Sequence, residues 1–325
     1  MKILHINDQA GVACVLAKYQ KYYGINSKVL LPNSILTNYK FDKFGIYKFY
    51  KDHVTISNGF NYLDHCISEA RDVDVIHIHS MEDLVVKMRK TFGNSKKIIL
   101  HYHGTDLRGL KPNFSTLQNI KTKTKLLAVN LRQRTRLVKM GYYKLLSTLR
   151  KESQNLADEL LVSTPDLLEL LPNAKYLPNP VDVDHFSKDK VRHDKTDSNA
   201  LTIKTPTGNI EKTLQYCKHN NIDLKIDVFD RTTNPLQYKE VPNLLKKYDI
   251  YVDIRIVNDR ILQSLSKTGL ESLACGLKVL NYKLEFQNKL PEIHNPLNVV
   301  KQLQNIYNHV EFYRPNKTLE STINS

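Results

Sequence analysis

The chain has 325 residues, of which 41% are hydrophobic and 25% charged, and its formal net charge at pH 7 is +15. This composition is typical of a soluble globular protein, and the length allows two domains of ordinary size. No run approaches the roughly 18 apolar residues that a membrane-spanning helix needs. The opening MKILHIND is too short and too soon polar for a signal peptide. We therefore expect neither a membrane span nor a secretory leader.

The positive charge is concentrated in the first half of the chain. Residues 1–180 hold 27 Lys and Arg against 15 Asp and Glu, whereas residues 181–325 hold 21 against 18. Such a surplus favours phosphate-bearing partners, which are anionic lipid, a lipid-linked phosphate or nucleic acid. The four cysteines show no metal-ligand spacing, so reduced thiols in the cytoplasm are the simplest interpretation.

The first elements predict a parallel sheet. Lys2 to Ile6 alternates as a strand, a helix starts at Val12, and Ser27 to Leu31 is the next strand. Strand, small-residue turn, helix and strand form the first unit of such a sheet. The turn before the helix contains Gly11, where a substrate phosphate could approach the helix N-terminus; tight packing of the turn is an equal alternative.

Two later strands carry four histidines. In VDVIHIH and KIILHYH, His77 and His79 alternate onto one face, as do His101 and His103. If the strands are neighbours, the four imidazoles gather at the carboxyl edge of the sheet, where open parallel sheets bind ligands. A zinc site, core or rim histidines satisfied by backbone groups, and a substrate-binding loop are the three interpretations.

Residues 121–151 contain ten Lys and Arg and no Asp or Glu. The later half of this segment places apolar residues on one helical face. A basic amphipathic helix is typical of a membrane-surface element, and a solvated helix packed on the sheet is the alternative. Nucleic acid would suit the charge, but no recognised nucleic-acid-binding pattern accompanies it.

The second half again alternates strands and helices. A polar stretch at 187–199 indicates a linker, and strands are expected at 201–205, 224–229 and 250–254. The helix that starts at Gln263 ends at Gly276, which supplies a left-handed cap. Glu271 lies inside this otherwise apolar helix, and a carboxylate there is costly unless something binds it. An amphipathic helix at 296–312 and a tail follow.

Four motifs in order resemble those of retaining glycosyltransferases of the GT-B fold, the group 1 or family 4 set, in its archaeal-type branch. They are HGTDL, PNPVD, KTPTGNIEK and GLESLACG. The sequence departs from the family pattern at Gln263, where a second glutamate is usual, and at Pro180, which replaces a glycine.

The resemblance implies an α/β protein with two Rossmann-like, doubly wound parallel-sheet domains facing across a cleft. Residues 1–180 would form the acceptor domain, 181–199 the linker, 200–312 the donor-nucleotide domain with a terminal helix that crosses back, and 313–325 a tail. The implied enzyme is a metal-independent, hexosyltransferase-type glycosyltransferase that moves a sugar from a nucleoside-diphosphate donor to an acceptor hydroxyl with retention. The acceptor would be a glycan or a lipid-linked, anionic molecule, and the enzyme would be cytoplasmic, as a peripheral protein at the inner membrane face.

The resemblance also assigns site residues. His103 would contact the transferred sugar and Asp106 would fix the loop, as the catalytic pair. Donor-binding residues would be Lys212 and Lys267 on the diphosphate, Glu271 on the ribose, and Ser266 and Thr207 in the loops; Gly11 and His79 would lie on the acceptor side. No metal and no cofactor are implied, because the nucleotide sugar is a substrate. Two other functions remain open: a GT-B protein that has lost catalysis and only binds, and a basic nucleic-acid-binding protein.

Overall fold

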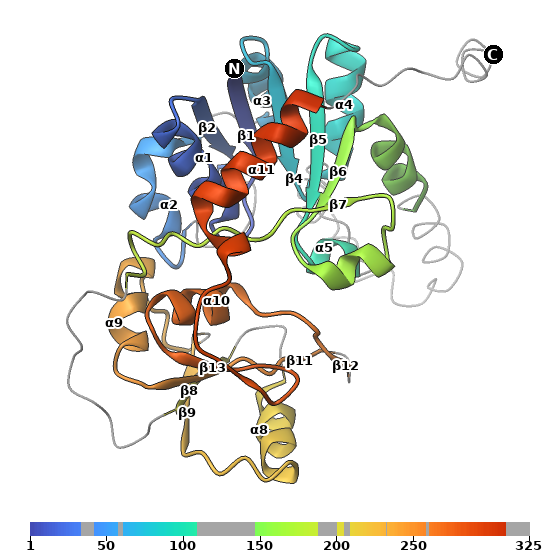
Figure 1. The fold of residues 1–325 in the computed structure, drawn as a ribbon. Helices are drawn as coiled ribbons and strands as arrows, with labels where there is room; N and C mark the ends of the chain where they lie inside the picture. Colours follow the sequence, from blue (N-terminus) through green and yellow to red (C-terminus); the bar gives the residue numbers. More distant parts are fainter. Residues whose placement is uncertain are drawn as a thin grey trace, which may run out of the picture.

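Two parallel sheets, one in each half of the chain, organise the structure (Figure 1). The computed structural model describes residues 1–33, 42–57, 61–108, 147–187, 200–204, 209–231, 233–257 and 260–309. Most of the basic segment 121–151, Thr207, much of the expected linker and the tail therefore lie outside the described residues. We call the half around the first sheet the first lobe and the half around the second sheet the second lobe.

The first lobe is built on seven parallel strands in the order β3-β2-β1-β4-β5-β6-β7. Its central strands are almost wholly buried on both faces, as in sheets covered by helices on each side, although histidines alternate with the apolar residues along one of these faces. The strands are β1 (Lys2–Ile6), β2 (Asn26–Leu31), β3 (Val54–Ile56), β4 (Val75–His79), β5 (Lys97–Tyr102), β6 (Glu159–Val162) and β7 (Lys175–Tyr176).

Short helices connect these strands. They are α1 (Val12–Tyr22), α2 (Ile46–Phe49), α3 (Tyr62–Ala70), α4 (Glu82–Phe92), α5 (Thr105–Arg108), a helical stretch at 147–156, and the 3-10 turns η2 (Lys51–His53) and η3 (Pro165–Glu169). In η3 proline occupies the start of the turn, and the side chain of the preceding Thr164 makes no capping hydrogen bond.

The second lobe has five strands in the order β14-β13-β10-β8-β9, which are parallel except that β13 and β14 pair antiparallel. Its elements are β8 (Ala200–Lys204), α8 (Ile210–His219), β9 (Ile226–Asp230), η4 (Tyr238–Glu240), α9 (Val241–Leu245), β10 (Ile250–Val252), β11 (Ile256–Val257), β12 (Arg260–Ile261), α10 (Lys267–Ala274), β13 (Lys278–Leu280), β14 (Phe286–Gln287), η5 (Glu292–His294) and α11 (Pro296–His309).

The helix expected from Gln263 starts later, at Lys267. Ser266 has extended backbone angles, and its side chain accepts a hydrogen bond from the N–H of Gly269, which makes it the N-cap. Residues 263–266 form a bend and an extended stretch in place of the expected first helical turn, and they follow the antiparallel pair β11–β12. Apolar spacing alone did not reveal this, because it does not encode the cap that sets where a helix begins.

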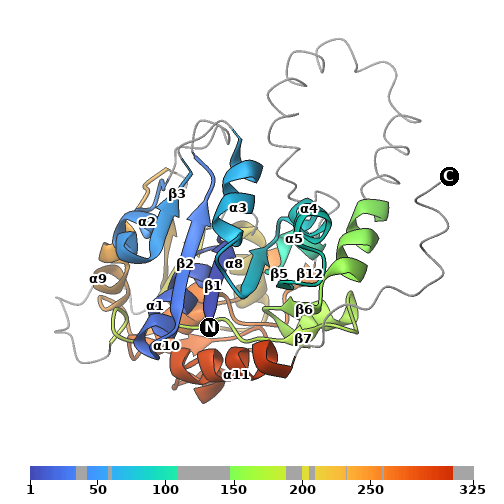
Figure 2. The same ribbon diagram turned by 90° about the horizontal axis from the view of Figure 1, so that it is seen from above.

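The last described helix, α11, returns to the first lobe, where it crosses the face of the sheet beside α1 (Figures 1 and 2). The side chain of Gln302 donates to the carbonyl of Tyr176 on β7, and the Lys97 ammonium donates to the carbonyl of Tyr307 at 2.6 Å. Tyr307 is fully buried, so the end of α11 is part of the core of the first lobe.

Contacts beside Asp182, in the segment that joins the two lobes, hold the lobes together. The N–H of Tyr238 in the second lobe donates to the carbonyl of Phe44 in the first at 2.6 Å. The buried carboxylate of Asp182 accepts from Lys18, Tyr19 and Tyr50 at 2.7, 3.0 and 2.8 Å. One hydrophobic cluster extends from α1, through Val181 and Phe186 between the lobes, to residues of the second lobe. Within the described residues no helix is long and apolar enough to cross a bilayer.

Candidate functional site

The N-terminal ends of α1 and α10 face each other where the two lobes meet. The ammonium of Lys267 on α10 donates a hydrogen bond to the carbonyl of Ala10, in the turn before α1. A Cβ at Gly11 would lie 3.0 Å from the Lys267 Nζ, and the φ of Gly11 is +79°. This position therefore favours glycine for both its backbone angle and the lack of space. Gly11 and Lys267, predicted on opposite sides of a cleft, are in direct contact range.

A carboxylate of the chain itself occupies the N-terminus of α1. Asp8 follows β1, and its two oxygens accept the N–H groups of Gly11 at 2.6 Å and Ala13 at 2.7 Å. Asp8 is only 5% exposed, and burial raises the pKa of its carboxyl group, against the opposing charge of Lys267. The free N–H groups that could attract a phosphate at this helix start are thus partly used.

The N-terminus of α10 is filled in the same way. Asp253, which follows β10, accepts the N–H of Ser266 at 2.6 Å. A Cβ at Gly269 would lie 2.3 Å from the Asp253 Oδ2, so the glycine lets the carboxylate reach the first turn of the helix. Burial raises the pKa of the Asp253 carboxyl, and Arg255 opposes the shift. The Ser266 N–H, expected to bind the donor diphosphate, is therefore already bound by an internal anion.

Glu271 is buried one turn further along α10, with 5% of its surface exposed. Burial raises the pKa of its carboxyl to about 7, although Lys267 and Arg231 favour the ionised form. Within the described residues no hydrogen bond to the Glu271 carboxylate is found, so its oxygens have capacity for hydroxyl donors of a ligand.

Arg231 was not singled out from the sequence. It directly follows β9, at the carboxyl edge of the second sheet, and its guanidinium lies 4.2 Å from the ring centre of Phe44 in the first lobe. Burial lowers the pKa of Arg231, and the charge of Glu271 opposes that shift. Arg231 thus supplies a cation beside Glu271 that sequence reasoning missed, and its place directly after a parallel strand was the available signal.

Three buried polar atoms around this edge make no hydrogen bond among the described residues: Arg231 Nε, and Arg255 Nε and Asp253 Oδ1, which face each other as an ion pair at 3.6 Å. Buried polar atoms are rarely left without a hydrogen bond, so Arg231 Nε in particular marks a place where a ligand could complete the bonding. The adjoining cavity is lined by Lys204, Asn209, Asp253, Arg255, Ser266 and neighbours, and its volume is about 50 Å³. Ligand pockets usually measure roughly 300–1,000 Å³, so a nucleotide sugar would also have to enter the space between the lobes.

Lys212 and Thr207 contribute little to this picture. Lys212 is exposed in the first turn of α8, its N–H bonded to the Asn209 side chain at 2.9 Å, and it does not line the cavity. Thr207 lies outside the described residues. The described contacts do not bring Lys212 next to Glu271.

Asp106 fixes the loop that follows β5. Its carboxylate accepts the N–H groups of His103, Gly104 and Leu107 at 2.8, 2.6 and 3.0 Å, and the Ser80 hydroxyl also donates to it. These bonds use its lone pairs inside the loop. This geometry suits the loop-fixing role expected for Asp106 and leaves it little capacity for a substrate.

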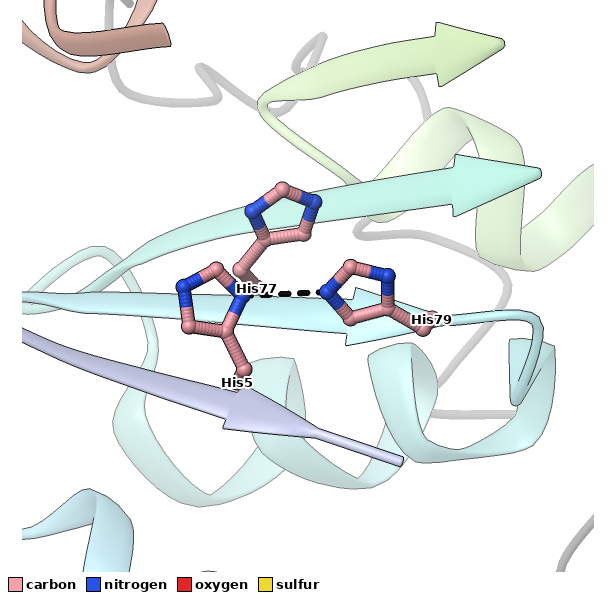
Figure 3. A group of neighbouring side chains, drawn as sticks. All are labelled: His5, His77 and His79. Carbon is pink, nitrogen blue, oxygen red and sulfur yellow. Dashed lines mark hydrogen bonds between the residues drawn. The ribbon is translucent and has the colours of Figure 1, made fainter. Parts of the chain in front are cut away.

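The histidines of β4 do gather with His101 of β5 and with His103, which follows β5. His5 of β1 joins them, and it lies beside His77 and His79 (Figure 3). His79 lies at the centre: its Nε2 is 3.0 Å from His5 Nδ1, and its Nδ1 is 2.8 Å from His103 Nε2. Ser163 contacts the Nδ1 of His103 at 2.7 Å, so both ring nitrogens of His103 are engaged within the protein.

Two sets of three histidines could offer nitrogens to a metal ion. In each set one ring nitrogen per residue lies within 4.8 Å of the others, among the residues that the structure describes. The sets are His5, His77 and His79, and His79, His101 and His103.

Comparison with known proteins gives a match in fold but not in sequence. No family model and no curated protein matches the chain. An alpha-glucosyltransferase in complex with UDP and a 13-mer DNA containing a central A:G mismatch superposes with a TM-score of 0.52 at 11% identity, covering 94% of this chain and 90% of that one. An alpha-glucosyltransferase in complex with UDP-glucose and DNA containing an abasic site gives 0.51 at 10% identity, with coverage of 94% and 90%.

A glycotransferase of kitacinnamycin gives a TM-score of 0.41 at 10% identity, covering 93% of this chain and 84% of that one. The matches above 0.5 extend over nearly the whole chain and include both lobes. Together with the two sheets, they confirm the predicted fold, which is GT-B.

Proposed function

We propose that the protein is a glycosyltransferase that binds a nucleoside-diphosphate sugar at the edge of the second lobe and an acceptor at the first. The observation that carries the proposal is the group of incompletely paired charges that faces the first lobe. Arg231, Glu271 and Lys267 supply two cations and a carboxylate, which match a diphosphate and the hydroxyls of a ribose. The GT-B likeness and the family 4 resemblance of GLESLACG support the same assignment.

In this proposal Glu271 accepts hydrogen bonds from the ribose, while Lys267 leaves the Ala10 carbonyl for the diphosphate. The leaving diphosphate is stabilised by fixed cations, which is electrostatic catalysis of a developing negative charge. Lys212 contributes at longer range, and Thr207 remains an expected loop contact. Retention of configuration, a hexosyl donor and independence of metal ions follow from the family resemblance alone.

The acceptor proposed is anionic, because the net charge is +15 and the surplus lies in residues 1–180. A lipid-linked acceptor at a membrane surface is the first candidate. Nucleic acid is the second, because the charge suits it and two of the similar structures contain DNA. Transfer to lipid-linked and to duplex DNA acceptors, each at low and high salt, distinguishes the two.

Donor binding is tested by a thermal-shift screen of nucleotide sugars, because a ligand that binds only the folded state raises the apparent melting temperature. A rise with one nucleotide sugar, followed by radiolabel transfer to an acceptor, is the expected result. Stabilisation without transfer would identify a binding protein that has lost catalysis. Absence of any shift, with salt-dependent DNA binding retained, would contradict the proposal.

A further inference from the structure

The five buried imidazoles of the first lobe are joined in one unbroken series of hydrogen bonds. Besides the contacts of His79, the Nε2 of His77 lies 3.2 Å from the Nδ1 of His101, and Ser163 Oγ lies 2.9 Å from the Nε2 of His101. At one end Tyr307 meets His77 Nδ1 at 2.6 Å, and at the other Gln20 Oε1 meets His5 Nε2 at 2.8 Å. The order is Tyr307, His77, His101, Ser163, His103, His79, His5 and Gln20.

The rings meet end to end. For His5 and His79 the ring centres are 5.3 Å apart and the nitrogens 3.0 Å; for His79 and His103 the values are 5.1 and 2.8 Å. In both pairs the two distances differ by about the sum of two ring radii, so the nitrogens lie close to the line between the centres. An N–H on one ring then points straight at the lone pair of the next, which is the favourable hydrogen-bond alignment.

The Gln20 amide lies with Oε1 in contact with both His5 and Ser27, while its buried Nε2 has no hydrogen-bond partner among the described residues. In this orientation of the amide, the order allows one direction of donation. Gln20 Oε1 can only accept, so with the amide as it lies His5 donates from Nε2 and must accept at Nδ1. His79 then donates from Nε2 to His5, and His103 donates from Nε2 to His79. Ser163 donates to His103 Nδ1 and accepts from His101 Nε2; His77 donates to His101, and the Tyr307 hydroxyl donates to His77.

We propose that these eight residues form a single directional circuit that holds all five imidazoles neutral in the Nε2–H form. In this circuit Tyr307, His77, His101 and Ser163 are positioning residues for His103, the partly buried ring of the five and the one that faces Lys267 of the second lobe. The circuit itself does not depend on the proposed transferase activity; its consequence for the site, a His103 of fixed tautomer, does.

An added proton would disrupt the circuit wherever it settled. A protonated ring donates from both nitrogens, so one of its neighbours would face a second donor. The charged groups that face the series are Asp106, whose carboxylate binds the backbone of His103, and Lys267 of the second lobe. Consistently, burial lowers the pKa of all five rings, to about 4 for His5 and for His103.

A transition metal fits the described geometry less well than protons do. His77 and His79 are stacked 4.4 Å apart at an interplanar angle of 11°, so one ion cannot lie in the plane of both rings. Each nitrogen of the five rings already has a hydrogen-bond partner within the described chain, which leaves no lone pair aimed at a vacant position. Ligands of a metal would each need such a lone pair.

The test is two-bond ¹H–¹⁵N spectroscopy of the full chain labelled at its 12 histidines, from about pH 8 down to about pH 5. Five histidines are expected to show the Nε2–H pattern throughout this range. An Nδ1–H pattern in any of the five, titration of any of them near its ordinary pKa, or a stoichiometric metal ion in the purified protein would overturn the proposal.

Two variants test the direction. Tyr307→Phe removes the terminal donor and should change the signals of His77 and His101. Tyr62→Phe, which removes another buried hydroxyl bonded at 2.9 Å to the Leu30 carbonyl, should leave all five unchanged. Equal spectra in Tyr307→Phe and wild type would contradict the circuit.

Ser163→Ala interrupts the middle of the circuit. It is expected to raise the pKa of His103 by at least about one unit, because the lone pair at Nδ1 loses its donor, and Ser163→Thr should restore the original value. If transfer activity is found, its pH profile should shift in Ser163→Ala and return in Ser163→Thr. If no activity is found in the wild type, the spectra still decide the circuit, so its failure and that of the proposed function are distinguishable.

Discussion

At the carboxyl edge of the first sheet, β1, β4 and β5 carry five neutral rings that satisfy one another, whereas the facing edge of the second lobe carries charged groups whose bonding is incomplete. Every ring nitrogen of the first edge has a partner within the described chain, and only Nε2 of Gln20, at the end of the series, lacks one there; at the second edge the guanidinium Nε of Arg231 lacks one. A set of buried polar groups that is fully paired becomes rigid, while one that is partly paired favours whatever completes it. The difference indicates that the first lobe supplies a fixed surface and the second lobe the binding energy for a charged ligand.

Both lobes nevertheless share one arrangement, in which a carboxylate of the chain fills the N-terminus of a helix. Asp8 and Asp253 each follow a strand and occupy the N-terminus of the next helix, where a substrate phosphate could have bound. Glycine at positions 11 and 269 makes room for the close contacts around them. A diphosphate would therefore be bound more by side-chain cations than by helix N–H groups, and the cations at this place are Arg231 and Lys267.

Lowering the pH should reduce the free energy of unfolding mainly through the histidines of the first edge. The pKa of His5 falls from 6.5 to about 4 on folding, so between these values the unfolded chain binds more protons and the free energy of unfolding decreases as pH falls. His5 alone accounts for about 3 kcal/mol at most, and the other rings act in the same direction. Denaturant titrations at neutral and acid pH measure the loss.

At the second edge, Glu271 makes the free energy of unfolding depend on pH in the opposite direction. The pKa of Glu271 is raised from 4.5 to about 7, so its contribution to stability is lost as pH rises through that window. Glu271→Gln should remove this component and leave the acid-induced loss in place. A profile without acid sensitivity in both proteins would show that the rings are not held neutral.

The largest effect on ligand affinity is expected at Glu271. Glu271→Ala should weaken binding of the nucleotide sugar about a hundredfold, because charged hydrogen bonds contribute about 1.5–3 kcal/mol each. Calorimetry measures the change, with Glu285→Ala, an exposed site in the same lobe, as the control. Equal affinity in wild type and Glu271→Ala would remove the ribose assignment.

Arg231→Lys keeps the charge but loses the planar fork that binds a diphosphate at two points. We expect roughly a tenfold loss of affinity, about 1.4 kcal/mol. Arg260→Lys, at an exposed position, is the matched control. A loss shared by both variants would point to general electrostatics and not to a contact.

The smallest effect is expected at Lys212. Because this lysine is exposed, Lys212→Ala should reduce affinity by less than about threefold, as surface ion pairs contribute about 0–1 kcal/mol. Lys218→Ala on the same helix serves as its control. A loss as large as that of Glu271→Ala would instead place the diphosphate at α8.

Sequence patterns predicted much of the fold, because strand alternation and helix spacing are local. Four of the five histidines could be placed together from their alternation on two strands, but His5 could not, since its neighbour β4 lies about 70 residues away in sequence. Likewise the late start of α10 followed from the capping by Ser266 and Asp253, which no apolar spacing reveals.

By itself, the sequence determined two sheets with helices between them, a buried glutamate in the helix before Gly276, and histidines at strand ends. Only the tertiary structure decided that Asp253 fills the start of α10, that Arg231 lies beside Phe44, and that Tyr307 and Gln20 close the series of imidazoles. The reason is physical: periodicity encodes which face of an element is buried, whereas the partner of a buried polar group is set by packing between distant segments.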